Sequence, residues 1–183
     1  SPEMLQGEHP ALTPDLLDSA GAGGPDLIVL VNPNSPTGRH LPRSQIEHWL
    51  RDLPPSTRVW IDETYVDYVG ADQSVEKFAA NSQNVVICKS MSKVYALSGM
   101  RIGYLCGPAR LMAELRAITP PWVVGLPAQV AAVNALRDPE YYEGRYRQTH
   151  HLRAQLAQRL AELDVDVIAG TANFLLAHLP EHG

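Results

Sequence analysis

The chain has 183 residues, of which 45% are hydrophobic, and its formal net charge is −5 at pH 7. This apolar content is enough to bury a sizeable core, and the length suits one domain or a little more. The negative charge argues against a broad nucleic-acid-binding surface. No apolar run approaches the roughly 20 residues that a membrane-spanning helix needs.

The first part of the chain is expected to hold a short polar helix around Pro14 to Ala20, followed by a Gly-rich loop up to residue 24. No signal peptide is recognised, although the chain begins at Ser1 without a methionine. Cys88 and Cys106 both fall in predicted core strands. Cysteines of that kind are more often buried apolar side chains than a disulfide, which suits a reducing cytoplasm.

Strands and helices alternate through the first two thirds of the chain. Apolar runs predict strands near 27–31, 58–62, 84–88 and 101–106, with helices near 43–52 and 74–80 between them. This order is typical of an α/β fold with a mostly parallel sheet. The link between the third and fourth strands is too short for a crossover helix, so the fourth strand is predicted to run antiparallel.

The last third is predicted to be mainly helical. Helices are expected from Pro108 to about Ile118, from Pro127 to Leu136 and from Pro139 to Leu163, followed by strands at Val165–Ile168 and Phe174–Ala177. The long helix carries leucines at positions 152, 156, 160 and 163, and such one-sided helices often bridge domains. Its Tyr141, Tyr142 and Tyr146 are expected to pack against the preceding domain rather than to form a recognition surface. The histidines show no ligand spacing, and no metal site is predicted.

The segment from residue 90 to 101, SMSKVYALSGMR, contains residue types that suit a pyridoxal-phosphate site. A lysine such as Lys93 can form an imine with the cofactor's aldehyde group. Ser90, Ser92 and Arg101 offer two hydroxyl groups and a guanidinium group for a phosphate. Two alternatives remain at this point: a solvated lysine in a serine-rich loop, and the S-x-x-K motif of penicillin-recognising acyl enzymes. The second would need S-D-N and K-T-G, which are absent.

A carboxylate lies at the end of the second predicted strand, which is where open α/β sheets place groups that bind ligands. Asp62 could keep a pyridine nitrogen protonated, so that the cofactor ring accepts electrons. Tyr65 could direct its hydroxyl group at the same ligand. Upstream, the first strand is followed by NPNSPTG, a run of turn-forming residues.

Together, NPNSPTG, IDETY and KSMSKVYALSGMRIGY resemble the class I/II aminotransferases of the fold type I pyridoxal-phosphate enzymes, and among them the histidinol-phosphate aminotransferase group. The resemblance implies the α/β large domain of that fold, with helices on both faces of a sheet that has one antiparallel strand. It implies that Lys93 carries the Schiff base, that Asp62 pairs with the pyridinium nitrogen and that Tyr65 hydrogen-bonds the phenolic oxygen. Ser90, Ser92 and Arg101 would hold the phosphate.

The chain departs from the family pattern at one position. Relatives usually have an asparagine directly before Pro-Thr-Gly, and it donates to the phenolic oxygen. This chain has Ser35 there, with Asn34 one place earlier. A serine hydroxyl reaches less far than an amide. Either Ser35 makes the contact or the loop shifts to present Asn34, and Ser35 is preferred because Pro33 and Pro36 restrict the backbone.

Members of the family are longer than this chain. The resemblance assigns residues 1–138 to the large domain, 139–163 to an interdomain helix and 164–183 to the beginning of a small α+β domain. The chain would lack the upstream Gly-containing phosphate loop, the ring that stacks on the cofactor, and the downstream arginine that clamps the substrate carboxylate.

The function implied is pyridoxal-phosphate-dependent transamination of an amino acid or amino-alcohol phosphate through the Lys93 Schiff base, with a small-molecule amino donor and a 2-oxo acid acceptor. The full-length protein would be a cytoplasmic homodimer. The same residues would serve a decarboxylase of the threonine-phosphate type. A further alternative is a truncated, non-catalytic piece that only binds the cofactor or a partner.

Overall fold

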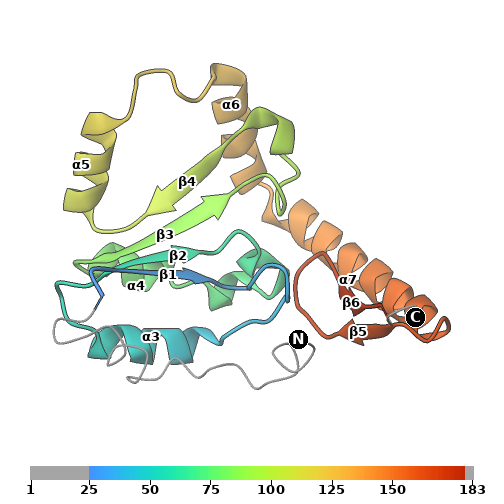
Figure 1. The fold of residues 1–183 in the computed structure, drawn as a ribbon. Helices are drawn as coiled ribbons and strands as arrows, with labels where there is room; N and C mark the ends of the chain where they lie inside the picture. Colours follow the sequence, from blue (N-terminus) through green and yellow to red (C-terminus); the bar gives the residue numbers. More distant parts are fainter. Residues whose placement is uncertain (1–24, 180–183) are drawn as a thin grey trace.

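The computed structural model describes residues 25–179. A four-stranded sheet forms the centre, with its strands in the order β1 to β4 (Figure 1). Its strands are β1 Leu27–Val31, β2 Arg58–Asp62, β3 Val85–Ser90 and β4 Gly103–Cys106. The first three are parallel and β4 is antiparallel to β3, which confirms the predicted sheet. The helix predicted at Pro14 to Ala20 lies outside the described residues.

Helices lie on both sides of this sheet. On one side, α3 Arg43–Asp52 and α4 Glu76–Asn81 lie together, and on the other side are α5 Ala109–Ile118 and α6 Leu126–Leu136. Ile46, Trp49 and Leu50 recur at helical spacing on α3 and are buried. They join the core cluster that contains Val59 and Ile61 of β2. The first helix layer is therefore held by ordinary amphipathic packing.

Strand register brings three loops to one edge of the sheet. Val31 at the end of β1 pairs with Asp62 at the end of β2, and Asp62 pairs with Cys88 of β3. Since the three strands are parallel, the loops that follow them all leave from the carboxyl edge. These loops carry NPNSPTG, the residues after Asp62, and the segment with Lys93, as the sequence predicted.

A long helix connects the main sheet to a small second one. Helix α7 spans Pro139–Ala161 and begins at Asp138, whose side chain accepts a hydrogen bond from the backbone amide of Tyr141. It leads to β5 Asp166–Ile168 and β6 Leu176–His178, which pair antiparallel. Tyr146 packs against Tyr68, and Tyr142 packs against Tyr95, beside the main sheet, as predicted. The prediction was wrong for Tyr141, which is exposed. The leucines at 152, 156 and 163 are also exposed among the described residues.

Strand β3 spans Val85–Ser90 where 84–88 was predicted, and β5 begins one residue later than predicted. Strands β4 and β6 each begin two residues later than predicted, for local reasons. Strand β4 begins at Gly103 and not at 101, because Arg101 adopts a left-handed conformation at the end of the short helix η3 Ser98–Met100. Strand β6 begins at Leu176, two residues later than predicted, and Phe174 instead packs edge-on against the ring of Tyr65. Cys88 and Cys106 are half-buried free thiols in β3 and β4.

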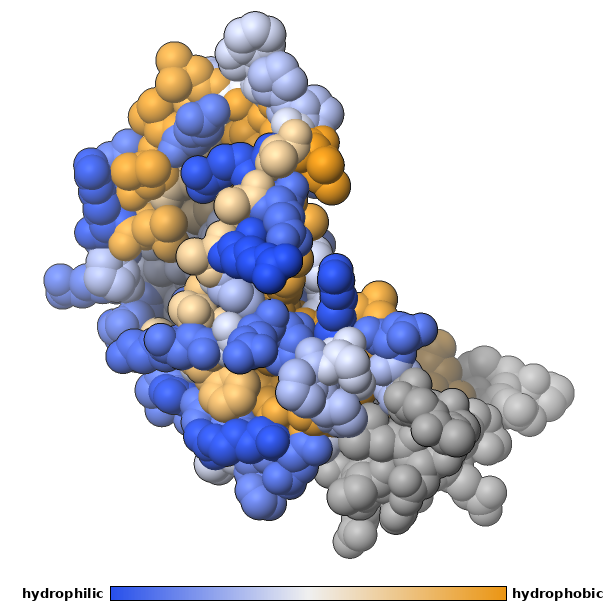
Figure 2. Space-filling model, turned by 90° about the vertical axis from the view of Figure 1, so that its left-hand side faces the viewer, coloured by the Kyte–Doolittle hydropathy of each residue, from blue (hydrophilic) through white to orange (hydrophobic). Residues whose placement is uncertain are grey.

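The sheet edges and the helices on one side leave apolar surface exposed. Within residues 25–179, β1 pairs with β2 alone and β4 with β3 alone. Figure 2 shows apolar residues gathered on the upper part of the molecule, where α5 lies. Exposed members of α5, α6 and the loop between them are Ile118, Trp122, Val123, Leu126, Val130, Val133 and Leu136. No helix among the described residues is long and apolar enough to cross a membrane.

Candidate active site

A buried asparagine holds the proline-rich loop after β1. The backbone amide of Asn32 donates to the Asp62 carbonyl oxygen at 2.9 Å. The Asn32 side chain accepts from the Leu41 amide at 2.7 Å and donates to the Leu41 carbonyl at 3.0 Å. These bonds fix both ends of the loop beside the end of β2.

Within this loop, Asn34 makes hydrogen bonds to other loop residues, whereas Ser35 is exposed. The Asn34 side-chain amide donates to the Thr37 hydroxyl group at 2.8 Å, and the Asn34 backbone carbonyl accepts from Gly38 at 2.7 Å. Asn34 therefore organises the loop itself. Ser35 is exposed at the loop's surface.

Asp62 and Tyr65 lie close together at the end of β2. One Asp62 carboxylate oxygen accepts a hydrogen bond from the Thr64 amide at 2.8 Å. Burial raises the pKa of the Tyr65 hydroxyl group, and the negative charge of Asp62 raises it further. A tyrosine with a raised pKa stays protonated and can donate a hydrogen bond. Phe174, from the loop before β6, packs edge-on against Tyr65 with ring centroids 5.3 Å apart.

The three predicted phosphate ligands line one cavity between the ends of β3 and β4. Ser90, Ser92 and Arg101 border this space of about 370 Å³. The Ser90 and Ser92 hydroxyl oxygens lie 2.9 Å apart, and the Ser92 amide donates to the Ser90 oxygen at 3.3 Å. Arg101 is exposed, and its guanidinium group also donates to the Ser98 carbonyl oxygen. This donor set is the kind that binds a phosphate dianion.

Lys93 follows β3 in a short turn. Buried Met91 and Val94 anchor the turn on either side, while the Lys93 side chain is exposed and its carbonyl accepts from the Ala96 amide at 3.2 Å. Asp62 is the last residue of β2, and Lys93 lies in the turn after β3, so both lie at the same edge of two adjacent parallel strands.

Sequence analysis missed a buried ionic cluster directly beneath this edge. The Lys89 side chain, 5% exposed, places its ammonium group 3.4 Å from Glu76, 3.7 Å from Glu63 and 3.8 Å from Asp67. We call these four residues the Lys89 cluster. Glu63 accepts further hydrogen bonds from the Ser74 hydroxyl at 2.6 Å and the Val75 amide at 2.8 Å.

The Lys89 cluster carries more carboxylates than cations. Burial raises the pKa of both Glu63 and Asp67 above their ordinary values, although the charge of Lys89 opposes the shift in each case. In the chain, Lys89 comes directly before Ser90, and Glu63 comes directly after Asp62. A signal for the cluster was present in the sequence, because Lys89 is a lone charge at the end of an otherwise apolar strand.

The chain matches the family model described as aminotransferase class I and II over residues 10–182. The chain therefore belongs to the class I and II aminotransferase family. It is similar to a histidinol-phosphate aminotransferase of Rhodopseudomonas palustris, with 31% identity over 157 residues that cover 85% of this chain and 43% of the relative. A histidinol-phosphate aminotransferase 2 of Ralstonia nicotianae is 34% identical over 169 residues, covering 90% of this chain and 45% of the relative.

Solved structures share the fold. The histidinol-phosphate aminotransferase of Sinorhizobium meliloti in complex with pyridoxal-5'-phosphate superimposes with a TM-score of 0.83 at 23% identity, over 90% of this chain and 45% of that one. The L-threonine-O-3-phosphate decarboxylase of Porphyromonas gingivalis gives 0.77 at 29% identity, over 87% and 52%. The chain thus spans about half the length of the relatives it matches.

Proposed function

We propose that this chain carries the cofactor-binding centre of a pyridoxal-phosphate-dependent aminotransferase of the histidinol-phosphate type, with Lys93 forming the Schiff base. The observation that carries the proposal is the meeting of Ser90, Ser92 and Arg101 in one cavity. This cavity lies at the edge of the sheet where β2 ends at Asp62 and where β3 is followed by the turn that contains Lys93. The family membership of the chain supports the same reading.

The residue types present suit the cofactor, and the three proposed phosphate ligands border one cavity. Ser90, Ser92 and Arg101 would bind its phosphate in their shared cavity. Asp62 would hold a proton on the pyridinium nitrogen, and Tyr65, protonated because burial raises its pKa, would donate to the phenolic oxygen. Ser35 would make the second contact to that oxygen, since the Asn34 amide is already engaged with Thr37. When bound, pyridoxal phosphate supplies an aldehyde and an electron-accepting ring.

Lys93 would have two roles in this arrangement. Its exposed side chain leaves it accessible to an aldehyde and to an incoming amino substrate. Once the substrate has displaced it, the freed amine would act as a general base and move the proton at the substrate's Cα. Asp62 would keep the proton on the cofactor's pyridine nitrogen.

A decarboxylase is the second candidate, and the structural similarity to the L-threonine-O-3-phosphate decarboxylase favours it. The cofactor-binding residues would be the same in both reactions. The two reactions differ in which bond at the substrate's Cα is broken, and residues that orient the substrate would decide this. A screen of amino donors that includes histidinol phosphate and threonine phosphate, with amino-group transfer to a 2-oxo acid and carbon dioxide release both measured, distinguishes them.

We further propose that a full-length protein containing this chain is a cytoplasmic homodimer that converts small amino and 2-oxo acids. The exposed apolar residues of α5 and α6 support an interface there, and the two half-buried free thiols agree with a reducing compartment. The division at residues 138 and 163 is supported by the separate sheets at the two ends of α7. The 183-residue chain by itself should bind the cofactor weakly and catalyse no transamination.

A covalent-trapping experiment tests the Lys93 assignment even if binding is weak. The chain contains three lysines, Lys77, Lys89 and Lys93, of which Lys77 and Lys93 are exposed. Incubation with excess pyridoxal phosphate should produce an absorbance band at ~420 nm. Reduction with borohydride followed by peptide mass spectrometry should then place the adduct mainly on Lys93.

Lys77→Ala is the matched control, since it removes the other exposed lysine and should leave the band unchanged, whereas Lys93→Ala should abolish it. Equal labelling of Lys77 and Lys93 would contradict the assignment. A reactive Ser90 without any lysine adduct would instead support the acyl-enzyme alternative.

A further inference from the structure

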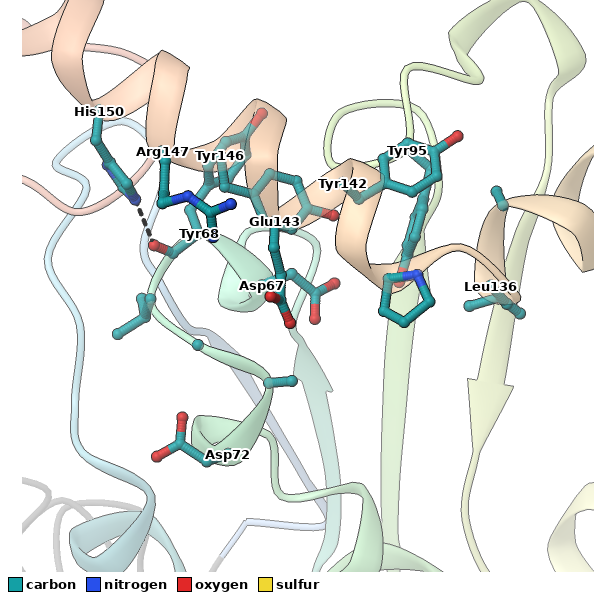
Figure 3. A pocket seen from close by; sticks show the side chains of 15 residues that line it. Asp67, Tyr68, Asp72, Tyr95, Leu136, Tyr142, Glu143, Tyr146, Arg147 and His150 are labelled. Carbon is teal, nitrogen blue, oxygen red and sulfur yellow. Dashed lines mark hydrogen bonds between the residues drawn. The ribbon is translucent and has the colours of Figure 1, made fainter.

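A second cleft lies apart from the Ser90 cavity, between α7 and the two short helices η1 Val66–Tyr68 and η2 Ala71–Gln73. We call it the tyrosine cleft. It has a volume of about 530 Å³, which is within the range of small-molecule sites. The residues that matter for its chemistry are Asp67, Tyr95, Tyr142, Glu143, Tyr146 and Arg147 (Figure 3).

Asp67 lines this cleft and has one buried carboxylate oxygen that no donor satisfies among the described residues. Its side chain is 10% exposed, and its Oδ1 atom lies 3.8 Å from the Lys89 ammonium group. Its Oδ2 atom is buried and has no hydrogen-bond partner among the described residues. A buried carboxylate oxygen without a donor is costly, so a donor that enters the cleft would be bound favourably.

The net negative charge around Asp67 favours a cationic hydrogen-bond donor over a neutral one. The Lys89 cluster holds three carboxylates against one ammonium group, so Lys89 does not balance Asp67 alone. In Figure 3 the Glu143 side chain points from α7 into the cleft, on the side of Asp67. Asp72 also lines the cleft, and Arg147 is the opposing charge on its α7 wall. His150 donates its Nε2 hydrogen to the Tyr68 carbonyl at 2.7 Å and is thereby held in place.

Tyrosine rings line the cleft and could contact the apolar part of a cationic ligand. Tyr95 and Tyr142 pack with ring centroids 4.9 Å apart. Tyr146 is 9% exposed, and its hydroxyl group is buried without a hydrogen-bond partner among the described residues. Burial raises the pKa of Tyr95 and of Tyr146, and the charge of Asp67 adds to both shifts, so both rings lie within the field of that carboxylate. Tyrosine faces near a carboxylate form a favourable environment for an organic ammonium ion.

We propose that the tyrosine cleft binds a small organic amine in its ammonium form. The Asp67 carboxylate and the Tyr146 hydroxyl group turn from their buried positions toward the cleft to accept hydrogen bonds from the ammonium group, and the apolar part of the amine lies against the tyrosine rings. This site uses none of the residues assigned to the cofactor, so it goes beyond the proposed function. Arg147 competes with the amine for the acidic residues of the cleft.

The test is a titration of the 183-residue chain with benzylamine at neutral pH, followed by backbone amide NMR shifts, without pyridoxal phosphate. We expect saturable shifts in residues 67–72 and 142–150, with a dissociation constant on the order of 1 mM. Benzyl alcohol, which has the same shape without the charge, should bind at least about tenfold more weakly. The same titration in Lys93→Ala should be unchanged, so the outcome is independent of the cofactor site.

Variants locate the binding site. Asp67→Asn should weaken benzylamine binding about tenfold and Tyr146→Phe a few-fold, whereas Arg147→Gln should strengthen it because the competing cation is removed. Asp52→Asn, a change at an exposed aspartate on α3, is the control and should have no effect. If Asp67→Asn unfolds the chain, Tyr146→Phe and Arg147→Gln still decide the matter. Equal binding of the alcohol, the absence of saturation below ~20 mM, or shifts outside the cleft would each overturn the proposal.

Discussion

The backbone amide of Ser90 donates a hydrogen bond to the side-chain hydroxyl oxygen of Thr64 at 3.3 Å. Thr64 also donates its own amide to the Asp62 carboxylate at 2.8 Å. One threonine thereby joins the residue proposed for the pyridinium nitrogen to a residue proposed for the phosphate, across the ends of β2 and β3. Their relative position is a property of the folded chain before any ligand arrives.

Thr64→Val should weaken this link without changing the shape of the side chain. Thr64 is buried, and valine cannot accept the hydrogen bond from the Ser90 amide. We expect a loss of about 1 kcal/mol in the free energy of unfolding, measured by urea denaturation. Thr64→Ser keeps the hydroxyl oxygen and should recover most of this hydrogen-bond contribution. If valine and serine variants are equally stable, the hydrogen bond contributes nothing.

Lys89→Met should be strongly destabilising because it leaves three carboxylates close together without their cation. Removing one partner of a buried ionic group typically costs about 3 to 5 kcal/mol. Urea denaturation at pH 7 measures this loss. Lys89→Arg keeps the charge and should be much less affected. The defect of Lys89→Met should shrink at pH 5, because burial raises the pKa of Glu63 and of Asp67 and both are protonated more easily there. A defect that is independent of pH would contradict the electrostatic explanation.

The free energy of unfolding should depend on pH through Glu63. Burial raises the pKa of Glu63 in the folded state, whereas in the unfolded chain it titrates near about 4.3. Above that pH the folded state binds more protons than the unfolded state. Its stability therefore falls as the pH rises through the folded-state pKa.

Glu63→Gln removes this titration, so its stability should decline less than that of the unchanged chain in urea denaturation between pH 4 and pH 8. Burial also raises the pKa of Asp67, so Asp67 adds a pH dependence of the same sign. The unchanged chain and the Glu63→Gln variant both retain this contribution. Glu162→Gln, at an exposed position, is the control and should follow the curve of the unchanged chain. Parallel curves for the chain and Glu63→Gln would show that Glu63 does not titrate as described.

Gly103→Ala should push β4 away from β3 next to the cavity that Ser90 lines. A Cβ atom at position 103 would lie 2.7 Å from the Lys89 carbonyl oxygen and 3.3 Å from the Ser90 Cα atom. Both contacts are with backbone that is fixed by the sheet, so we expect a loss of about 1 to 3 kcal/mol. At Gly99 nothing lies within 4 Å of such a Cβ. Gly99→Ala is the matched control and should stay within about 0.5 kcal/mol of the unchanged chain in thermal or urea unfolding.

The sequence predicted the strands and helices well where a single pattern decides them. The bounds of β1, β2 and α3 agree with the prediction because each is a compact apolar or amphipathic run between turn residues. The start of β4 could not be predicted in this way. It depends on the left-handed backbone of Arg101, a conformation that is uncommon for any residue other than glycine.

The Lys89 cluster shows why the site could be predicted only in part. Asp62, Lys93 and Arg101 belong to local motifs whose order in the chain is itself informative. The three carboxylates around Lys89 come from separate segments after β2 and before β3, and they meet only when the strands pair. The tyrosine cleft depends in the same way on how α7 packs, which no local pattern specifies.

The roles of Asn34 and Ser35 in the proline-rich loop can be separated by two alanine variants. Asn34→Ala removes the donor to Thr37 and should lower the free energy of unfolding by about 1 kcal/mol. Ser35→Ala changes an exposed side chain and should leave stability within about 0.5 kcal/mol. If Ser35 contacts the cofactor, Ser35→Ala should nevertheless lower the yield of the trapped pyridoxal-phosphate adduct a few-fold, because a hydrogen bond to the bound ring is lost. Urea denaturation without cofactor and borohydride trapping with it give the two readouts. An unchanged adduct yield in Ser35→Ala, together with a large loss in Asn34→Ala, would assign the contact to Asn34 instead.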